Sequence, residues 1–161
     1  MPLNIKAIRQ QFPALNQSVN GKTPIFFDGP GGSQTTETTL KALRDYFAFY
    51  NANLGSNFFS GVKTTEVMQQ ARESVAALVN APSADNIVFG ATATMLMFNF
   101  SRAIGRDWQA GDEIIVTAAD HYSNVSSWKH IAKDKGVTVH QIAVDEQTFE
   151  IDYDELARKI N

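Results

Sequence analysis

The spacing of hydrophobic and polar positions changes near residue 86. Before this point, apolar residues recur every three or four positions in two stretches and predict amphipathic helices at 36–50 and 64–79. Asn4 can cap a shorter helix that Pro13 ends, and an apolar run predicts a strand at 24–28. We interpret residues 1–85 as a segment of helices and loops.

After residue 86, short apolar runs alternate with helical patterns. This alternation predicts a parallel sheet with flanking helices, an α/β fold in which the strand carboxyl ends share one rim. Asp152 is placed to cap a last helix. We therefore interpret 86–161 as the start of an α/β domain within a single partial domain of 161 residues. The predicted strands are 87–89, 113–117 and 137–144, and the predicted helices between them are 94–104 and 124–135.

Composition narrows the function classes. The 161 residues carry a net charge of -3 and contain no cysteine, which removes disulfides, cysteine metal ligands and a cysteine nucleophile from this sequence. No basic run offers a footprint for nucleic acid, and no apolar run approaches the length of a membrane span. We expect a cytoplasmic protein with neither nucleic acid nor membrane as partner, and no metal site, because no histidine pair has metal-ligand spacing.

The turn 90–94 between the predicted strand 87–89 and the next helix is small and rich in hydroxyl groups. Open backbone N–H groups and the helix dipole at such a position form an anion site, to which Thr92 and Thr94 can add hydroxyl donors. The alternative is a plain helix cap, for which threonine is a favoured residue. The turn alone does not separate the two interpretations.

His121 follows the predicted strand 113–117, so it is expected on the same rim as the turn 90–94. An imidazole there can exchange protons near neutral pH or lie against an aromatic ring. The alternative is a residue at the start of a helix that only bonds a neighbouring carbonyl.

Several motifs occur in an order that resembles the class V aminotransferase family, in particular its cysteine-desulfurase-like branch. They are Phe27 to Gly32, Asn51-Ala52-Asn53, Gly90 to Thr94, Asp120 to Trp128, and Val144-Asp145 before Ile151 to Leu156. The resemblance implies the large domain of a fold-type-I enzyme that uses pyridoxal 5′-phosphate (PLP). It also implies an amino-acid substrate, which reacts through an aldimine, and a homodimer in the complete protein.

The resemblance also assigns roles to residues. Ala93 and Thr94 match the pair that binds the cofactor phosphate, with Ala93 contributing only its backbone N–H. His121 matches the histidine that stacks on the cofactor ring and helps to move protons. Gly29, Gly31 and Gly32 match a loop that borders the substrate pocket.

Two departures from the family pattern qualify these expectations. Gly55-Ser56 stands where many desulfurases have a His-Arg pair, and no lysine here matches the one that forms the Schiff base. We therefore expect an N-terminal portion of such an enzyme, with an unpaired sheet edge. The alternatives are a non-catalytic module for dimerisation or partner binding, which would use Phe58 and Phe59, and a small flavodoxin-like phosphate-binding domain.

Overall fold

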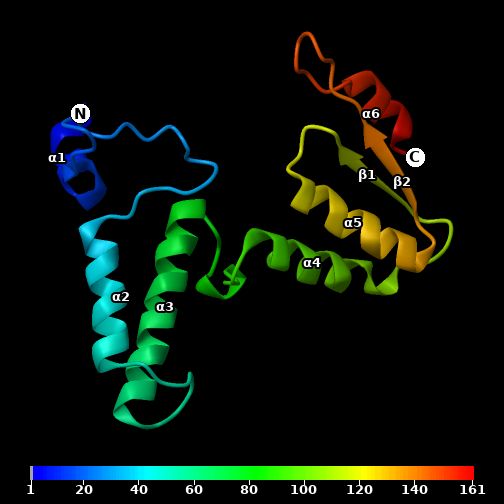
Figure 1. Cartoon of the computed structure of the whole chain (residues 1–161). Coiled ribbons are helices and arrows are strands. Elements are labelled where there is room, and N and C mark those ends of the chain that lie inside the picture. The colour runs from blue at the N-terminus through cyan, green and yellow to red at the C-terminus, as the bar shows by residue number, and fades with distance from the viewer. Residues whose placement is uncertain (1) are drawn as a thin grey trace. The chain divides into compact units, whose positions relative to one another are not determined.

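A computed structural model describes residues 2–161 and divides the chain into two compact units, Met1–Ile87 and Val88–Asn161 (Figure 1). The first unit is helical, and the second contains the sheet. Each unit is described by itself below. Among residues 2–161, no helix combines the length and the apolar character that crossing a bilayer requires.

The first unit contains helices α1 (Ile5–Gln10), α2 (Glu37–Phe49) and α3 (Phe59–Val79), with short 3-10 turns at Pro13–Asn16 and Ala84–Asn86. The Asn4 side chain caps α1 by accepting the Ala7 N–H, as the sequence predicts. Thr36 caps α2 in the same way. Helix α3 starts five residues before the predicted position 64, so Phe59 belongs to the helix rather than to the preceding loop.

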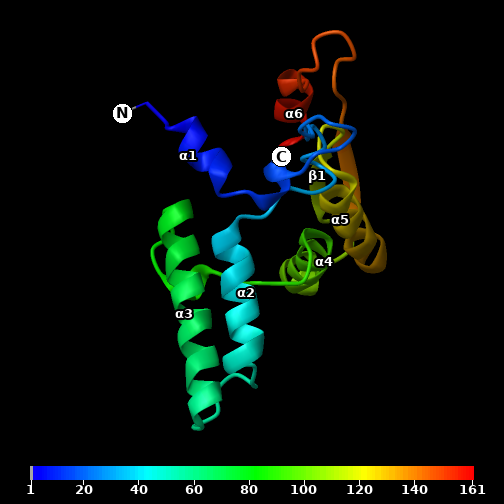
Figure 2. The same cartoon turned by 60° about the vertical axis from the view of Figure 1, so that its left-hand side comes forward.

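Helices α2 and α3 lie side by side, as both Figure 1 and Figure 2 show. The buried hydroxyl of Thr64 in α3 donates to the carbonyl of Tyr50 at 3.2 Å and lies 3.4 Å from the Tyr46 hydroxyl. The rings of Tyr50 and Phe59 meet edge to face, with centroids 6.4 Å apart. These contacts join the two helices at the end where the loop 51–58 connects them.

The strand predicted at 24–28 is wrong, because the segment is irregular in the structure. A strand needs a neighbour for its backbone N–H and C=O groups, and no described segment pairs with this one. Phe27 is 92% exposed, so its side chain has no core to enter. The turn at 29–31 that follows is irregular, as predicted.

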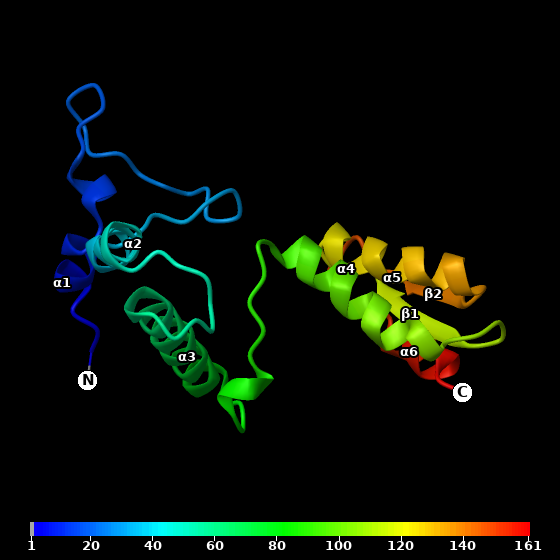
Figure 3. The same cartoon turned by 90° about the horizontal axis from the view of Figure 1, so that it is seen from below.

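The second unit contains helix α4 (Ala93–Ile104), a 3-10 turn (Gly105–Asp107), strand β1 (Glu113–Thr117), helix α5 (Tyr122–Lys135), strand β2 (Thr138–Ile142) and helix α6 (Tyr153–Lys159). Strands β1 and β2 pair in parallel from Glu113↔Thr138 to Thr117↔Ile142. Helix α5 makes the crossover between them, and α4 runs along α5 (Figure 3). Helices therefore flank a parallel sheet, which confirms the predicted fold class.

The core of the second unit lies between the sheet and α5. Its buried apolar residues include Val116 and Ile142 from the strands and Val125, Ile131 and Ala132 from α5. Gly136 ends α5 in the left-handed conformation (φ 70°), which confirms its predicted role as a helix stop. Asp152 caps α6 by accepting the Glu155 N–H at 2.7 Å, also as predicted.

The strand predicted at 87–89 is also wrong. The segment is extended and leads into α4, but no described strand pairs with it, and Val88 is 72% exposed. The sheet has only β1 and β2 among the described residues, so the other edge of β1 is unpaired, as expected. An apolar run without a neighbouring strand keeps its extended backbone but forms no ladder.

Candidate functional site

The N-terminus of α4 holds two open backbone donors. The Thr92 hydroxyl accepts the Met95 N–H at 3.1 Å, and the Thr92 carbonyl accepts the Leu96 N–H at 3.1 Å. The N–H groups of Ala93 and Thr94 have no acceptor among residues 2–161, and both residues are exposed. Thr92 is thus the helix cap that the sequence left as one alternative, and the two residues predicted to hold a phosphate retain free donors.

The turn before α4 needs a small residue at position 90. A Cβ added to Gly90 would lie 2.6 Å from the side chain of Leu96, one turn into the helix. The chain therefore passes close to the start of α4. Because Gly90 has no side chain, nothing at position 90 covers the helix N-terminus.

His121 is the N-cap of α5. Its Nδ1 atom accepts the Ser123 backbone N–H at 3.2 Å and lies 2.7 Å from the Ser123 hydroxyl. The ring is exposed. The alternative is right in placing His121 at the start of a helix, but its predicted bond to a neighbouring carbonyl is wrong, because Nδ1 accepts a backbone N–H instead. The other nitrogen, Nε2, bonds to nothing within the described part of the chain.

Helices α4 and α5 run in the same direction, which brings both N-termini to one end of the unit. The rings of Phe98 and His130 lie 5.7 Å apart, and one turn further along both helices Arg102 lies 3.7 Å from Asp134. Likewise the Ser101 hydroxyl donates to the Ser127 carbonyl, and one turn further along both helices a Cβ at Gly105 would lie 2.7 Å from Ile131. Extending these pairings toward the N-termini places Ala93 level with the segment 119–125, which contains His121. The structure thus brings the predicted phosphate pair and the predicted stacking histidine to the same end, although the strand on which the prediction relied is absent.

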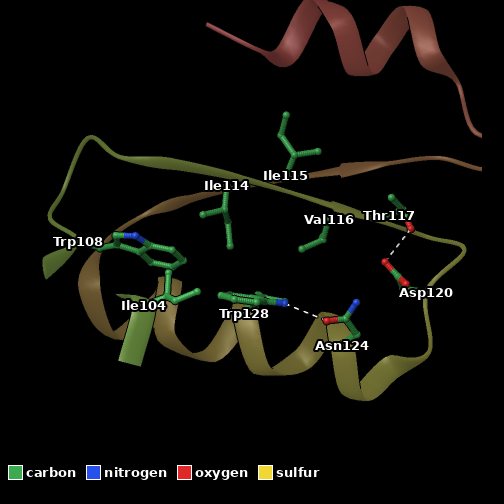
Figure 4. Close-up of a pocket in the computed structure, with 9 residues that line it drawn as sticks. All are labelled: Ile104, Trp108, Ile114, Ile115, Val116, Thr117, Asp120, Asn124 and Trp128. Carbon is green, nitrogen blue, oxygen red and sulfur yellow. Dashed lines mark hydrogen bonds between the residues drawn. The ribbon is translucent and has the colours of Figure 1, made fainter. Parts of the chain in front are cut away.

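A hollow between β1 and α5 reaches Asp120, in the loop that follows β1 (Figure 4). Its volume is about 390 Å³, and side chains of β1 and α5 line it together with Trp108 and Ile104. In its apolar part, Ile114 and Val116 point from β1 toward the side on which Trp128 of α5 lies (Figure 4).

The polar end of the hollow lies at the carboxyl end of β1. There the Thr117 hydroxyl donates to Asp120 at 3.1 Å, and Asn124 accepts the Trp128 indole N–H at 3.0 Å. The bond between Thr117 and Asp120 ties the loop that carries His121 to the end of β1.

The glycine loop of the first unit is a tight turn. The N–H groups of Gly31 and Gly32 donate to the Asp28 carbonyl at 3.1 and 3.0 Å, and a Cβ at Gly31 would lie 2.6 Å from the Asp28 carboxylate. A Cβ at Gly29 or Gly32 would meet nothing within 4 Å. The border of a substrate pocket at Gly29, Gly31 and Gly32 stays a prediction.

Sequence reasoning missed Ser123, whose backbone N–H and hydroxyl both contact the His121 ring. A signal was present, because an N-cap side chain pairs with the N–H two or three residues later. Recognising His121 as the cap would have pointed directly to Ser123.

Several curated proteins similar to this chain are named probable cysteine desulfurases. A probable cysteine desulfurase of Vibrio cholerae is 36% identical over 145 residues, which cover 88% of this chain and 36% of that protein. A probable cysteine desulfurase of Synechocystis is 32% identical over 157 residues, covering 95% of this chain and 37% of the relative. The chain spans about a third of the length of these curated relatives.

The solved structures similar to this chain also include a cysteine desulfurase. The cysteine desulfurase CsdA of Escherichia coli matches with a TM-score of 0.81 and 27% identity, over 100% of this chain and 39% of that one. A mutant of C-DES, with glycine covalently linked to its PLP cofactor, matches with a TM-score of 0.65 over 84% of this chain and 33% of that one. At 24% identity this second likeness shows the fold alone. The sequence family described as aminotransferase class-V matches residues 25–161, and this chain belongs to that family.

Proposed function

We propose that this chain supplies the phosphate-binding end of the cofactor site in a PLP-dependent, cysteine-desulfurase-like enzyme that acts on an amino acid. One observation carries the proposal. The N–H groups of Ala93 and Thr94 are open at the end of the unit that also holds His121. The names of the similar proteins support the reaction class, and membership of the aminotransferase class-V family supports the cofactor.

The residues at the start of α4 fit a phosphate. Two adjacent N–H donors point out of a helix of 12 residues, whose dipole favours negative charge at this end. The Thr94 hydroxyl donates no bond within the described residues and can add a third contact. Neither Ala93 nor Gly90 has a side chain large enough to exclude the group.

His121 fits the ring of such a cofactor. Its imidazole is exposed and is held by Ser123 at one nitrogen, so it presents a flat face and a free Nε2. PLP, when bound, acts as an electron sink for a substrate carbanion. The residues of this chain would bind the phosphate, orient the ring and offer Nε2 for a proton.

The activity of the complete protein, its homodimeric state and its cytoplasmic location are part of this proposal, because the chain spans about a third of its relatives. Cysteine as substrate rests on the names of those relatives. The His-Arg pair missing at Gly55-Ser56 leaves other amino acids open as substrates.

One observation favours a second candidate, a non-catalytic module that binds a partner or a second copy. The chain exposes 12632 Å² of solvent-accessible surface at a mass of 17.8 kDa. Two separate folded units with that total mass would expose about 9,600 Å². The excess includes large apolar side chains such as Phe58 at 79% and Phe59 at 68% exposure.

Ala93→Pro tests the phosphate site sharply. Position 93 is the first residue of α4, where proline is tolerated, and Thr92 has the extended backbone (φ -150°, ψ 157°) that suits a residue before proline. The substitution therefore removes one phosphate-facing N–H and keeps the helix. Tyr153→Pro is the matched control, because it makes the same change at the first residue of α6.

The ligand for this test is pyridoxine 5′-phosphate, which has no aldehyde to react with surface lysines. We expect it to shift the amide NMR signals of Ala93 and Thr94, and pyridoxine without phosphate to leave them in place. Ala93→Pro should weaken binding about tenfold, the factor expected for a hydrogen bond to a charged group. Equal binding of both ligands, or an unaffected Ala93→Pro, contradicts the proposal. Self-association with no pyridoxine phosphate binding supports the module instead.

A further inference from the structure

We propose that Ser123 is a positioning residue, which holds the His121 ring in the tautomer with its hydrogen on Nε2. Its importance for a reaction rests on the proposed function, whereas the orientation of the ring is a property of this chain alone.

The tautomer follows from which atoms can donate. The Ser123 backbone N–H, 3.2 Å from Nδ1 of His121, can only donate, so Nδ1 must accept. The Ser123 hydroxyl, 2.7 Å from the same nitrogen, can rotate its hydrogen toward it and donate as well. A neutral imidazole whose Nδ1 accepts carries its hydrogen on Nε2.

The backbone around the ring is held too. The His121 carbonyl accepts the Asn124 N–H at 2.9 Å, and His121 has the non-helical backbone (φ -57°, ψ 139°) of a residue outside the first turn. His121 is therefore bonded to α5 through both its backbone carbonyl and its ring Nδ1. This arrangement leaves Nε2 as the one ring atom of His121 that can exchange a proton with a bound group.

The other two histidines provide internal references. His140 places Nε2 2.6 Å from the Glu113 carboxylate, and the His130 ring lies against Phe98. The sequence contains three histidines in all, so the imidazole nitrogen signals of the chain can be assigned individually.

Imidazole ¹⁵N NMR on the 161-residue chain tests the inference without any cofactor. With neutral rings, we expect the Nδ1 signal of His121 to be that of an unprotonated nitrogen and Nε2 to carry the hydrogen. Ser123→Ala keeps the backbone donor but loses the hydroxyl, so the minor tautomer should increase by up to about tenfold. Ser123→Thr should restore the wild-type ratio, because it restores the hydroxyl.

Tyr122→Ala is the control for a change at the start of α5, since Tyr122 is 75% exposed and bonds to neither ring nitrogen. It should leave the tautomer ratio unchanged. A His121 ring with its hydrogen on Nδ1, or a ratio that Ser123→Ala does not move, overturns the inference.

Pyridoxine 5′-phosphate binding separates this inference from the proposed function. Ser123→Ala should leave the phosphate-induced shifts at Ala93 and Thr94 intact. If the tautomer is as expected but no phosphate binds, the proposed function fails and the positioning of the ring by Ser123 stands. If phosphate binds and the His121 tautomers are equally mixed, the positioning role fails.

Discussion

The hydroxyl of Thr92 accepts the backbone N–H of Met95 at 3.1 Å, and this single bond determines which donors of α4 stay open. It satisfies the third N–H of the helix and leaves the first two, those of Ala93 and Thr94, without an acceptor among residues 2–161. A helix cap and the two open donors that the proposed phosphate site requires therefore coexist at one helix end. The two interpretations that the sequence presented as alternatives concern different N–H groups.

Thr92→Ala should lower the free energy of unfolding by about 1 kcal/mol, the usual cost of losing a threonine cap. Urea denaturation followed by circular dichroism measures this change. Thr92→Ser retains the hydroxyl and should stay close to wild type. An unchanged midpoint for Thr92→Ala would show that the 3.1 Å bond contributes no stability.

Local sequence signals predicted the elements whose stability is local. Asn4, Asp152 and Gly136 start or end helices at the positions expected from them, because capping depends on residues within one turn. The predicted strands β1 and β2 do form in the structure, because each finds its neighbour within the chain.

The wrong predictions concern elements that need distant partners. The apolar runs at 24–28 and 87–89 have strand composition, but composition cannot show that no described strand lies beside them. Likewise, sequence placed Ala93, Thr94 and His121 at one end through a strand at 87–89. In the structure the parallel packing of α4 on α5 does this, through contacts such as Ser101 with Ser127.

Substitutions at His121 should separate its two roles. Asparagine is a good cap and has no ring, so His121→Asn should keep the stability of the chain and lose the ring's contribution to cofactor binding. Alanine removes both, and His121→Ala should cost about 1 kcal/mol more than His121→Asn in unfolding free energy. Thermal denaturation and binding of pyridoxine 5′-phosphate are measured for both variants. Equal affinities of wild type and His121→Asn would exclude a ring contact.

Acid should destabilise the loop after β2, because it protonates the carboxylate of Asp145. The backbone N–H groups of Thr148 and Gln147 donate to its carboxylate, each at 2.8 Å, and hold the pKa of Asp145 below its ordinary value. Because the folded value is the lower one, the carboxylate stabilises the loop above its unfolded pKa of about 3.9. That contribution is lost as the pH falls through the folded value.

Asp145→Asn is the matched variant, since its amide oxygen can accept the same N–H groups without a charge. We expect the stability difference between wild type and Asp145→Asn to shrink steadily below about pH 4. Carboxyl ¹³C NMR should show Asp145 titrating below the ordinary aspartate value of about 3.9. A titration at or above that value would contradict the role of the two backbone donors.

Substitution of Gly61 by alanine should destabilise the chain. A helical glycine normally gains about 1 kcal/mol of stability on substitution by alanine. A Cβ at Gly61, however, would lie 1.8 Å from the Ser56 hydroxyl and 2.8 Å from the Ser56 Cβ, so the loop 51–58 would have to move away from α3. Overpacking of this kind costs about 1–3 kcal/mol, so we expect Gly61→Ala to destabilise the chain.

The double variant Ser56→Gly with Gly61→Ala removes the side chain that clashes. It should be more stable than Gly61→Ala alone, and the difference in a double-mutant cycle measures the contact between the two positions. Gly32→Ala is the control, because a Cβ there meets nothing within 4 Å. A Gly61→Ala variant as stable as wild type would mean that the loop 51–58 shifts freely. In that case it could not present Asn51 to Asn53 at a fixed place beside α3.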